Sequence, residues 1–239
     1  MESELRSMTA FLFPSLTILY LALLISVLRR STGQWTIGRG AFAAFLAVLA
    51  ADALVISLGQ TIGEGDLLLG LNRLRVTLRV FALPCAVIAA FDQVRRAGLE
   101  WAAGRGSLRI LTAASLGLSA LGVYSVLSRR DLVVERFGGT LQYKVPGIAG
   151  PTIAAILAMT LLITFGMILF RRAGTPWMAV AATLLFVGSV VPPSLVGPVT
   201  GSITEALFAA ALFTMEGDSL GAPPSPQSQP PEGGTPNGY

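Results

Sequence analysis

Three ionisable residues lie inside long apolar stretches of the sequence: Asp52, Arg79 and Glu205. A charged side chain is costly in the hydrocarbon layer of a membrane, so such residues usually pair with one another and mark a functional site. Arg75 and Asn72 precede Arg79 by four and seven residues, which places them along one helix face. An arginine that faces two carboxylates forms a neutralising cluster with one excess acid, which can hold a proton. We predict a ligand-binding pocket lined by Asp52, Asn72, Arg75, Arg79 and Glu205.

A simpler interpretation of these charges stays open. Arg75 and Arg79 can extend toward the membrane interface while the carboxylates cap helices or pair locally. Asp92 has such a local interpretation, because Arg95 and Arg96 follow it by three and four residues and provide an ordinary helix-end pair.

The side chains on which many enzymes and metal sites depend are missing. The sequence has no histidine, which is the commonest metal ligand and general base. Cys85 is the only cysteine, so a disulfide within the chain and a cysteine zinc site are excluded. The net charge of +4 comes mostly from arginines at the ends of apolar stretches, which gives no support to nucleic-acid binding. We predict no catalytic residue, no metal and no cofactor.

The composition is that of an integral membrane protein embedded in a lipid bilayer. Hydrophobic residues make up 53% of the chain and charged residues 13%, whereas soluble proteins carry about 25% charged residues. Stretches near the ~20 residues needed to cross a bilayer predict an all-α bundle of seven transmembrane helices. Six is the alternative, because the last two stretches are short or diluted with polar residues. The seven stretches are roughly 8–28, 41–60, 74–94, 107–127, 149–170, 177–192 and 199–215.

One short motif, an arginine pair followed by a tryptophan, occurs three times, each time after an apolar stretch. The copies are "LRRSTGQW" at 28–35, "VRRAGLEW" at 94–101 and "FRRAGTPW" at 170–177. The first two copies also share a Gly-Arg-Gly, at 38–40 and 104–106. This spacing predicts three repeated helical hairpins followed by a seventh helix. The alternative is independent origin, since arginine and tryptophan are both favoured at membrane interfaces.

Two further segments lie outside the predicted helices. In the loop 128–148, two runs rich in β-formers flank Gly138-Gly139, which predicts a small extracellular β-hairpin between helices 4 and 5. The segment 218–239 is rich in Pro, Gly and Ser and predicts a disordered tail, so the transmembrane domain is assigned to 1–217.

The arginines also favour one orientation in the membrane. By count the two sides are nearly equal, with nine basic residues against eight, but the repeated loops concentrate theirs in short segments. Such concentration is typical of the cytoplasmic side, and the acidic "GEGD" at 63–66 falls on the opposite side. We predict a multi-pass protein of the bacterial inner (cell) membrane, with its N-terminus outside and its C-terminus in the cytoplasm.

Two families with seven membrane helices offer comparisons. A retinal-binding rhodopsin is excluded, because its Schiff base needs a lysine on the seventh helix and Lys144 is the only lysine. The segments "VLRRSTG" and "LNRLRVTLRVFALP" resemble the seven-helix membrane sensory region of bacterial histidine kinases. The resemblance covers about 8–215, with no kinase domain following it, and it implies a sensory function without identifying a ligand residue.

Three functions fit these features. The first is a non-enzymatic, receptor-like sensory protein whose arginines bind a small anionic or lipid-like ligand and whose arginine-rich loops contact a cytoplasmic signalling partner. The second is a small secondary transporter in which the intramembrane carboxylates carry a proton or cation. The third is a membrane enzyme that uses Asp52 or Glu205 as an acid on a lipid or isoprenoid.

Overall fold

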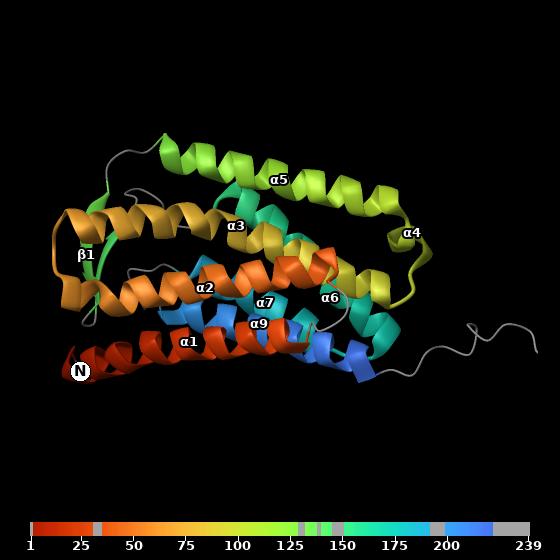
Figure 1. The fold of residues 1–239 in the computed structure, drawn as a ribbon, viewed down its shortest axis with the longest axis horizontal. Helices are drawn as coiled ribbons and strands as arrows, with labels where there is room; N and C mark the ends of the chain where they lie inside the picture. The colour runs from red at the N-terminus through yellow and green to blue at the C-terminus, as the bar shows by residue number, and fades with distance from the viewer. Residues whose placement is uncertain are drawn as a thin grey trace, which may run out of the picture.

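The computed structural model describes residues 2–30, 35–128, 132–137, 140–144, 151–191 and 199–221. In this part of the chain, helices run side by side along the long axis of the molecule, and a β-hairpin lies at one end (Figure 1). The helices are α1 (Glu2–Arg30), α2 (Ile37–Ile62), α3 (Asp66–Arg96), α4 (Glu100–Ala103), α5 (Arg105–Leu127), α6 (Ile153–Ala173), α7 (Trp177–Val190) and α9 (Val199–Gly221). The strands are β1 (Val133–Phe137) and β2 (Thr140–Lys144).

Helices occupy all of the predicted apolar stretches. Five of them are long and apolar enough to cross a membrane: Thr9–Arg30 in α1, α2, α3, Arg105–Val126 in α5, and α6. Helix α7 is apolar but shorter. The chain is therefore built as an integral multi-pass membrane protein, as its composition predicts. The short helix α4 was not predicted, and it lies in the loop between α3 and α5.

The repeated arginine pairs have a local structural reason. Each pair falls in the last turn of a helix, where the unpaired carbonyl groups and the helix dipole favour positive charge. The pairs are Arg29 and Arg30 in α1, Arg95 and Arg96 in α3, and Arg171 and Arg172 in α6. The helices that follow the first and third pairs, α2 and α7, pack against their predecessors.

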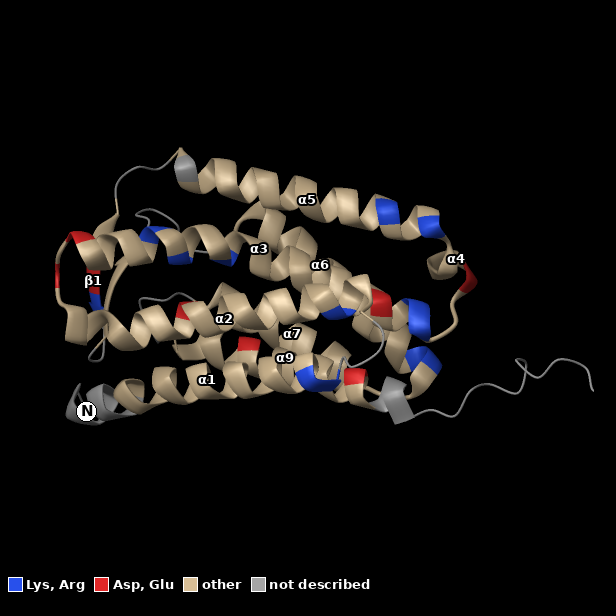
Figure 2. Cartoon of the chain, viewed as in Figure 1, with Lys and Arg blue, Asp and Glu red and all other residues tan. Residues whose placement is uncertain are grey.

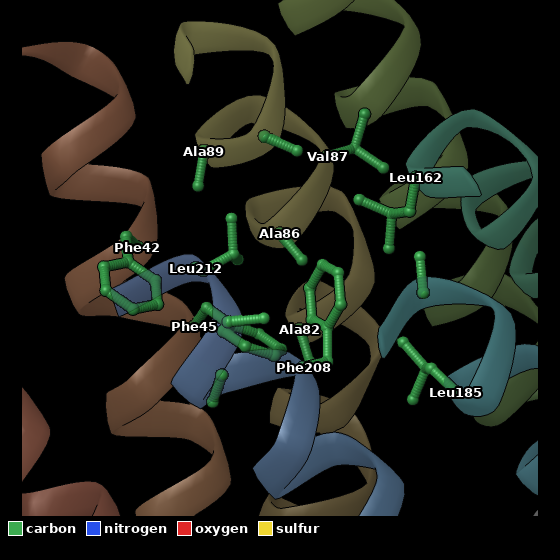
Figure 3. Packing of buried hydrophobic residues seen from close by; sticks show 14 of the residues in the cluster. Phe42, Phe45, Ala82, Ala86, Val87, Ala89, Leu162, Leu185, Phe208 and Leu212 are labelled. Atoms are coloured by element: carbon green, nitrogen blue, oxygen red, sulfur yellow. The ribbon is translucent and has the colours of Figure 1, made fainter. Parts of the chain in front are cut away.

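Helix α3 lies at the centre of the bundle. It contacts α2, α5, α6 and α9, while α9 also contacts α1 and α7. Alanines on α3 allow its neighbours to approach closely, and Figure 3 shows Ala82 and Ala86 facing Phe45 of α2 and Phe208 of α9. The two phenylalanine rings meet edge to face, with their centroids 6.1 Å apart. An apolar core therefore joins α2, α3 and α9 near the middle of the bundle's long axis.

The predicted β-hairpin is present. Strands β1 and β2 pair antiparallel, with Glu135 opposite Gln142, and the Gly138-Gly139 turn lies outside the described residues. Strand β2 lies directly on α2, because a Cβ on Gly59 would come within 2.0 Å of the carbonyl oxygen of Leu141. The hairpin thus covers one end of the bundle, called the hairpin end below.

The C-terminal helix is longer than predicted. Helix α9 continues to Gly221, past position 218 where the tail was expected to begin. The remainder of the predicted tail lies outside the described residues.

Candidate functional site

The three charges predicted from the apolar stretches meet in the bundle. Arg79 of α3 lies between Asp52 of α2 and Glu205 of α9. One terminal nitrogen of the guanidinium is 2.6 Å from Asp52 Oδ2, and the other is 2.5 Å from Glu205 Oε1. Three helices are thus joined by one arginine, and the alternative in which the carboxylates pair only locally is wrong for these residues.

Arg75 brings a second positive charge to this group. Its Nε lies 3.7 Å from Asp52 Oδ1, close enough for an ion pair but too long for a hydrogen bond. Neither of those two atoms has a hydrogen-bond partner, although both are buried. The predicted excess acid is therefore balanced, since two arginines face two carboxylates. We call Asp52, Arg75, Arg79 and Glu205 the Arg79 cluster.

Arg75 and Asn72 also attach the β-hairpin to α3. Arg75 donates a hydrogen bond of 3.0 Å to Gln142 Oε1, and Gln142 Nε2 donates one of 2.9 Å to Glu135. The backbone N–H of Tyr143 donates to Asn72 Oδ1 at 3.2 Å. Asn72 and Gln142 are 0% and 1% exposed. These contacts join both predicted site residues to the hairpin.

A cavity opens on a different side of Arg79. It has a volume of about 610 Å³ and lies between α3, α5 and α6, with a lining that is mostly aliphatic. Arg79 lines it, and the arginine side chain is 41% exposed, against 7% for Asp52 and 19% for Glu205. Arg79 is therefore the member of the cluster that an entering molecule would meet first.

A second group of charges lies on the same three helices, near the end of the bundle away from the β-hairpin. Glu216 of α9 accepts hydrogen bonds of 2.7 Å from Arg39 Nε and 2.7 Å from Gln93 Nε2, and Arg96 lies 3.2 Å away. Arg96 also pairs with Asp92 at 2.8 Å. We call Arg39, Asp92, Gln93, Arg96 and Glu216 the Glu216 cluster. Figure 2 shows charged residues near both ends of the bundle and a few on α2, α3 and α9 between them.

The sequence predicted only part of the Glu216 cluster, the pairing of Asp92 with the arginines that follow it. The helix-end pairs of Asp92 with Arg95 and Arg96 are present, at 3.5 and 2.8 Å. Asp92 does more than pair locally, because it is 5% exposed and accepts a hydrogen bond from Thr36 of the α1–α2 loop. The signal that could have revealed the cluster is Gln93, a polar residue between Asp92 and the arginine pair at the end of an apolar run.

The electrostatics of Glu216 follow from these contacts. Burial alone would raise the pKa of its carboxyl group. The hydrogen bond from Arg39 and the positive charge of Arg96 act the other way and outweigh burial, so the pKa lies below its ordinary value. Glu216 is thus held as a carboxylate at the end of the bundle.

Glycine permits the close approach of α2 and α3 at this cluster. A Cβ on Gly38 would come within 2.1 Å of the Asp92 Cβ, whereas a Cβ on Gly40 would meet nothing within 4 Å. Gly38 begins the first Gly-Arg-Gly copy, and Gly104, which begins the second, has no such neighbour. The same motif therefore has different roles in its two copies.

No group of three His, Cys, Asp or Glu side chains in the described part of the chain could hold a metal ion. A scan against protein-family models and a search of curated proteins both gave no match to the sequence. The class of the protein, a multi-pass helical membrane protein, therefore rests on its own composition and fold.

Proposed function

We propose that the protein is a non-enzymatic, receptor-like sensory protein with seven membrane-spanning helices. In this proposal α7 and α9 complete the bundle begun by the five long helices, and the three arginine–tryptophan motifs mark three repeated hairpins. It is of the same kind as the seven-helix sensory regions of bacterial histidine kinases, and it lies in the bacterial inner membrane with the hairpin end outside.

The observation that carries the proposal is the position of Arg79. It joins α2, α3 and α9 through two ion pairs, and it also lines a cavity large enough for a small molecule. A ligand that hydrogen-bonds Arg79 acts on the same side chain whose ion pairs set the spacing of these three helices. Binding and helix arrangement are therefore linked at one side chain, as a receptor requires.

The same helices connect the Arg79 cluster to the Glu216 cluster, so a change at one can be transmitted to the other. Glu205 and Glu216 are eleven residues apart on α9, about 16 Å at the rise of an α-helix. Eleven residues are close to three full turns, so both carboxylates lie on nearly the same face. A shift of α9 at the Arg79 cluster therefore acts on the Glu216 cluster, and the arginine-rich loops at that end would pass the change to a cytoplasmic partner.

The test is native mass spectrometry of the protein purified from its own membranes. We expect a bound small molecule on the wild type and less of it on Arg79→Lys, which keeps the charge but loses the planar set of donors. Arg136→Gln is the control, because Arg136 of β1 pairs at the surface with Glu64 of the α2–α3 turn and is not among the residues that line the cavity.

The opposite result would favour the transporter alternative. If no molecule copurifies, and vesicles containing the protein show a proton flux that Glu205→Gln abolishes, the sensory proposal is wrong.

A further inference from the structure

We propose that the cavity between α3, α5 and α6 binds an uncharged amphiphile from the bilayer, an apolar chain or ring that carries hydrogen-bond acceptors, with Arg79 as its polar contact. The inference rests on the proposed function and names the ligand class of that same site. Of the anionic and lipid-like ligands that the sequence suggests, the inference selects an uncharged, lipid-like one, because of the charge balance around Arg79.

The cavity suits an apolar body. Its volume of about 610 Å³ falls within the roughly 300–1,000 Å³ of typical small-molecule sites. Aliphatic side chains from all three helices form most of its wall, among them Val80, Leu83, Leu118, Leu121 and Leu157. An apolar molecule therefore replaces no hydrogen bonds when it enters, and it buries its surface against these chains.

Arg79 supplies the donors for a single polar group. A guanidinium carries five N–H donors, and two hydrogen bonds, to Asp52 and Glu205, account for two of them. The side chain is 41% exposed and lines the cavity. Donors are thus left for an acceptor that comes from the cavity side.

Charge balance decides what kind of acceptor fits. Asp52 and Glu205 already neutralise Arg75 and Arg79. A carboxylate or phosphate placed here would leave one uncompensated negative charge in a low-dielectric site, which is costly unless a proton is taken up. A hydroxyl, carbonyl or ester oxygen accepts the same hydrogen bonds and adds no charge.

The placement of α5 favours entry from the bilayer. In the apolar window of α5 only 11% of residues are buried, compared with 50% in α2. Among the described elements its main contacts are with α3, α4 and α6, and Figure 1 shows it along the edge of the bundle. Helix α5 touches α3 closely at Gly122, where a Cβ would lie 2.3 Å from Val80 Cγ1. The cavity therefore lies just inside the helix with the least protein around it.

The experiment is photo-crosslinking in nanodiscs with two probes of equal chain length, a monoacylglycerol and a fatty acid, each carrying a diazirine on the chain. We expect saturable labelling of cavity-lining residues by the monoacylglycerol. Labelling by the fatty acid at neutral pH should be about tenfold weaker at equal concentration, a difference of ~1.4 kcal/mol.

Two filling variants and one control variant test the site. Ala155→Phe fills the cavity from α6 and should abolish labelling, whereas Ala120→Phe, on an exposed position of α5 outside the lining, should leave it unchanged. Ser125→Phe fills the cavity from α5 and provides the same test if Ala155→Phe does not fold.

Each result has one meaning. Equal or stronger labelling by the fatty acid overturns the uncharged class, and labelling that survives both filling variants overturns the cavity. If neither probe labels the cavity but native mass spectrometry finds another bound molecule that depends on Arg79, the ligand class is wrong and the receptor proposal stands. If the monoacylglycerol binds but leaves hydrogen exchange near Glu216 unchanged, the binding site stands and the sensory function fails.

Discussion

The Arg79 cluster and the Glu216 cluster are built from the same three helices but are bonded differently. In the Glu216 cluster one carboxylate receives hydrogen bonds from both α2 and α3, and Glu216 and Arg39 are 4% and 5% exposed. In the Arg79 cluster, Arg79 faces a cavity, and Asp52 and Arg75 each have a buried atom without a hydrogen bond. The hydrogen bonds of the Glu216 cluster therefore hold the three helices in one arrangement. The Arg79 cluster is incompletely hydrogen-bonded and lies beside a cavity, so its side chains can change partners when a molecule binds there.

The largest effect is expected from Glu216→Leu. The substitution leaves Arg39 nearly buried without its main partner, and breaking a buried pair in this way costs about 3–5 kcal/mol. Thermal unfolding in detergent should show this loss. Glu64→Leu is the control, because Glu64 pairs with Arg136 at the surface, where such pairs contribute about 0–1 kcal/mol. Similar losses for both variants would contradict the structural role of Glu216.

Arg79→Leu should have a smaller effect. It leaves Glu205 unpaired, which costs about 3 kcal/mol if the carboxylate stays ionised. Asp52 still faces Arg75, and Arg79 is partly exposed, so the loss is smaller than for Glu216→Leu. The double replacement of Arg79 and Glu205 by Leu should be more stable than Arg79→Leu alone, because Asp52 keeps Arg75 and no carboxylate is left unpaired. Replacing Asp52 as well should remove this advantage, because Arg75 is then buried without its carboxylate. Thermal unfolding of the single, double and triple variants measures this coupling. Strictly additive losses would mean that the three residues do not act as one cluster.

The sequence revealed these two clusters unequally. Asp52, Arg79 and Glu205 could be found because each is isolated in an apolar stretch, where only a partner makes a charge tolerable. Glu216 and Arg39 could not, because they lie near helix ends, where charges are common and need no special explanation. Their pairing depends on how α9 lies against α2, which no local pattern encodes. In the same way the hairpin was predicted from its β-formers, but its attachment through Gln142 depends on where β2 docks on α3.

Gly38→Ala tests the packing beneath the Glu216 cluster. The added methyl would lie 2.1 Å from the Asp92 Cβ, so α2 and α3 must separate. Overpacking of this kind costs about 1–3 kcal/mol. Gly40→Ala is the matched control, because it lies two residues away in the same motif and its Cβ meets nothing within 4 Å. Thermal unfolding should separate the two variants, and equal stability would show that α2 and α3 are not in close contact there.

The smallest effect concerns pH, and it distinguishes the two clusters by the charge on Glu216. The folded protein holds the pKa of Glu216 below its ordinary value, which is about 4.3. The stabilisation is therefore complete above that ordinary value and is lost as the pH falls through the folded pKa. We expect the stability difference between the wild type and Glu216→Gln to be constant near neutral pH and to shrink in acid.

A protonated Glu216 can still accept hydrogen bonds from Arg39 and Gln93, so this change in stability should be smaller than the one caused by Glu216→Leu. Comparing the two proteins at each pH removes the titration of all other carboxyl groups. A difference that stayed constant into strong acid would mean that the charge of Glu216 contributes nothing, and that its hydrogen bonds alone hold this end of the bundle.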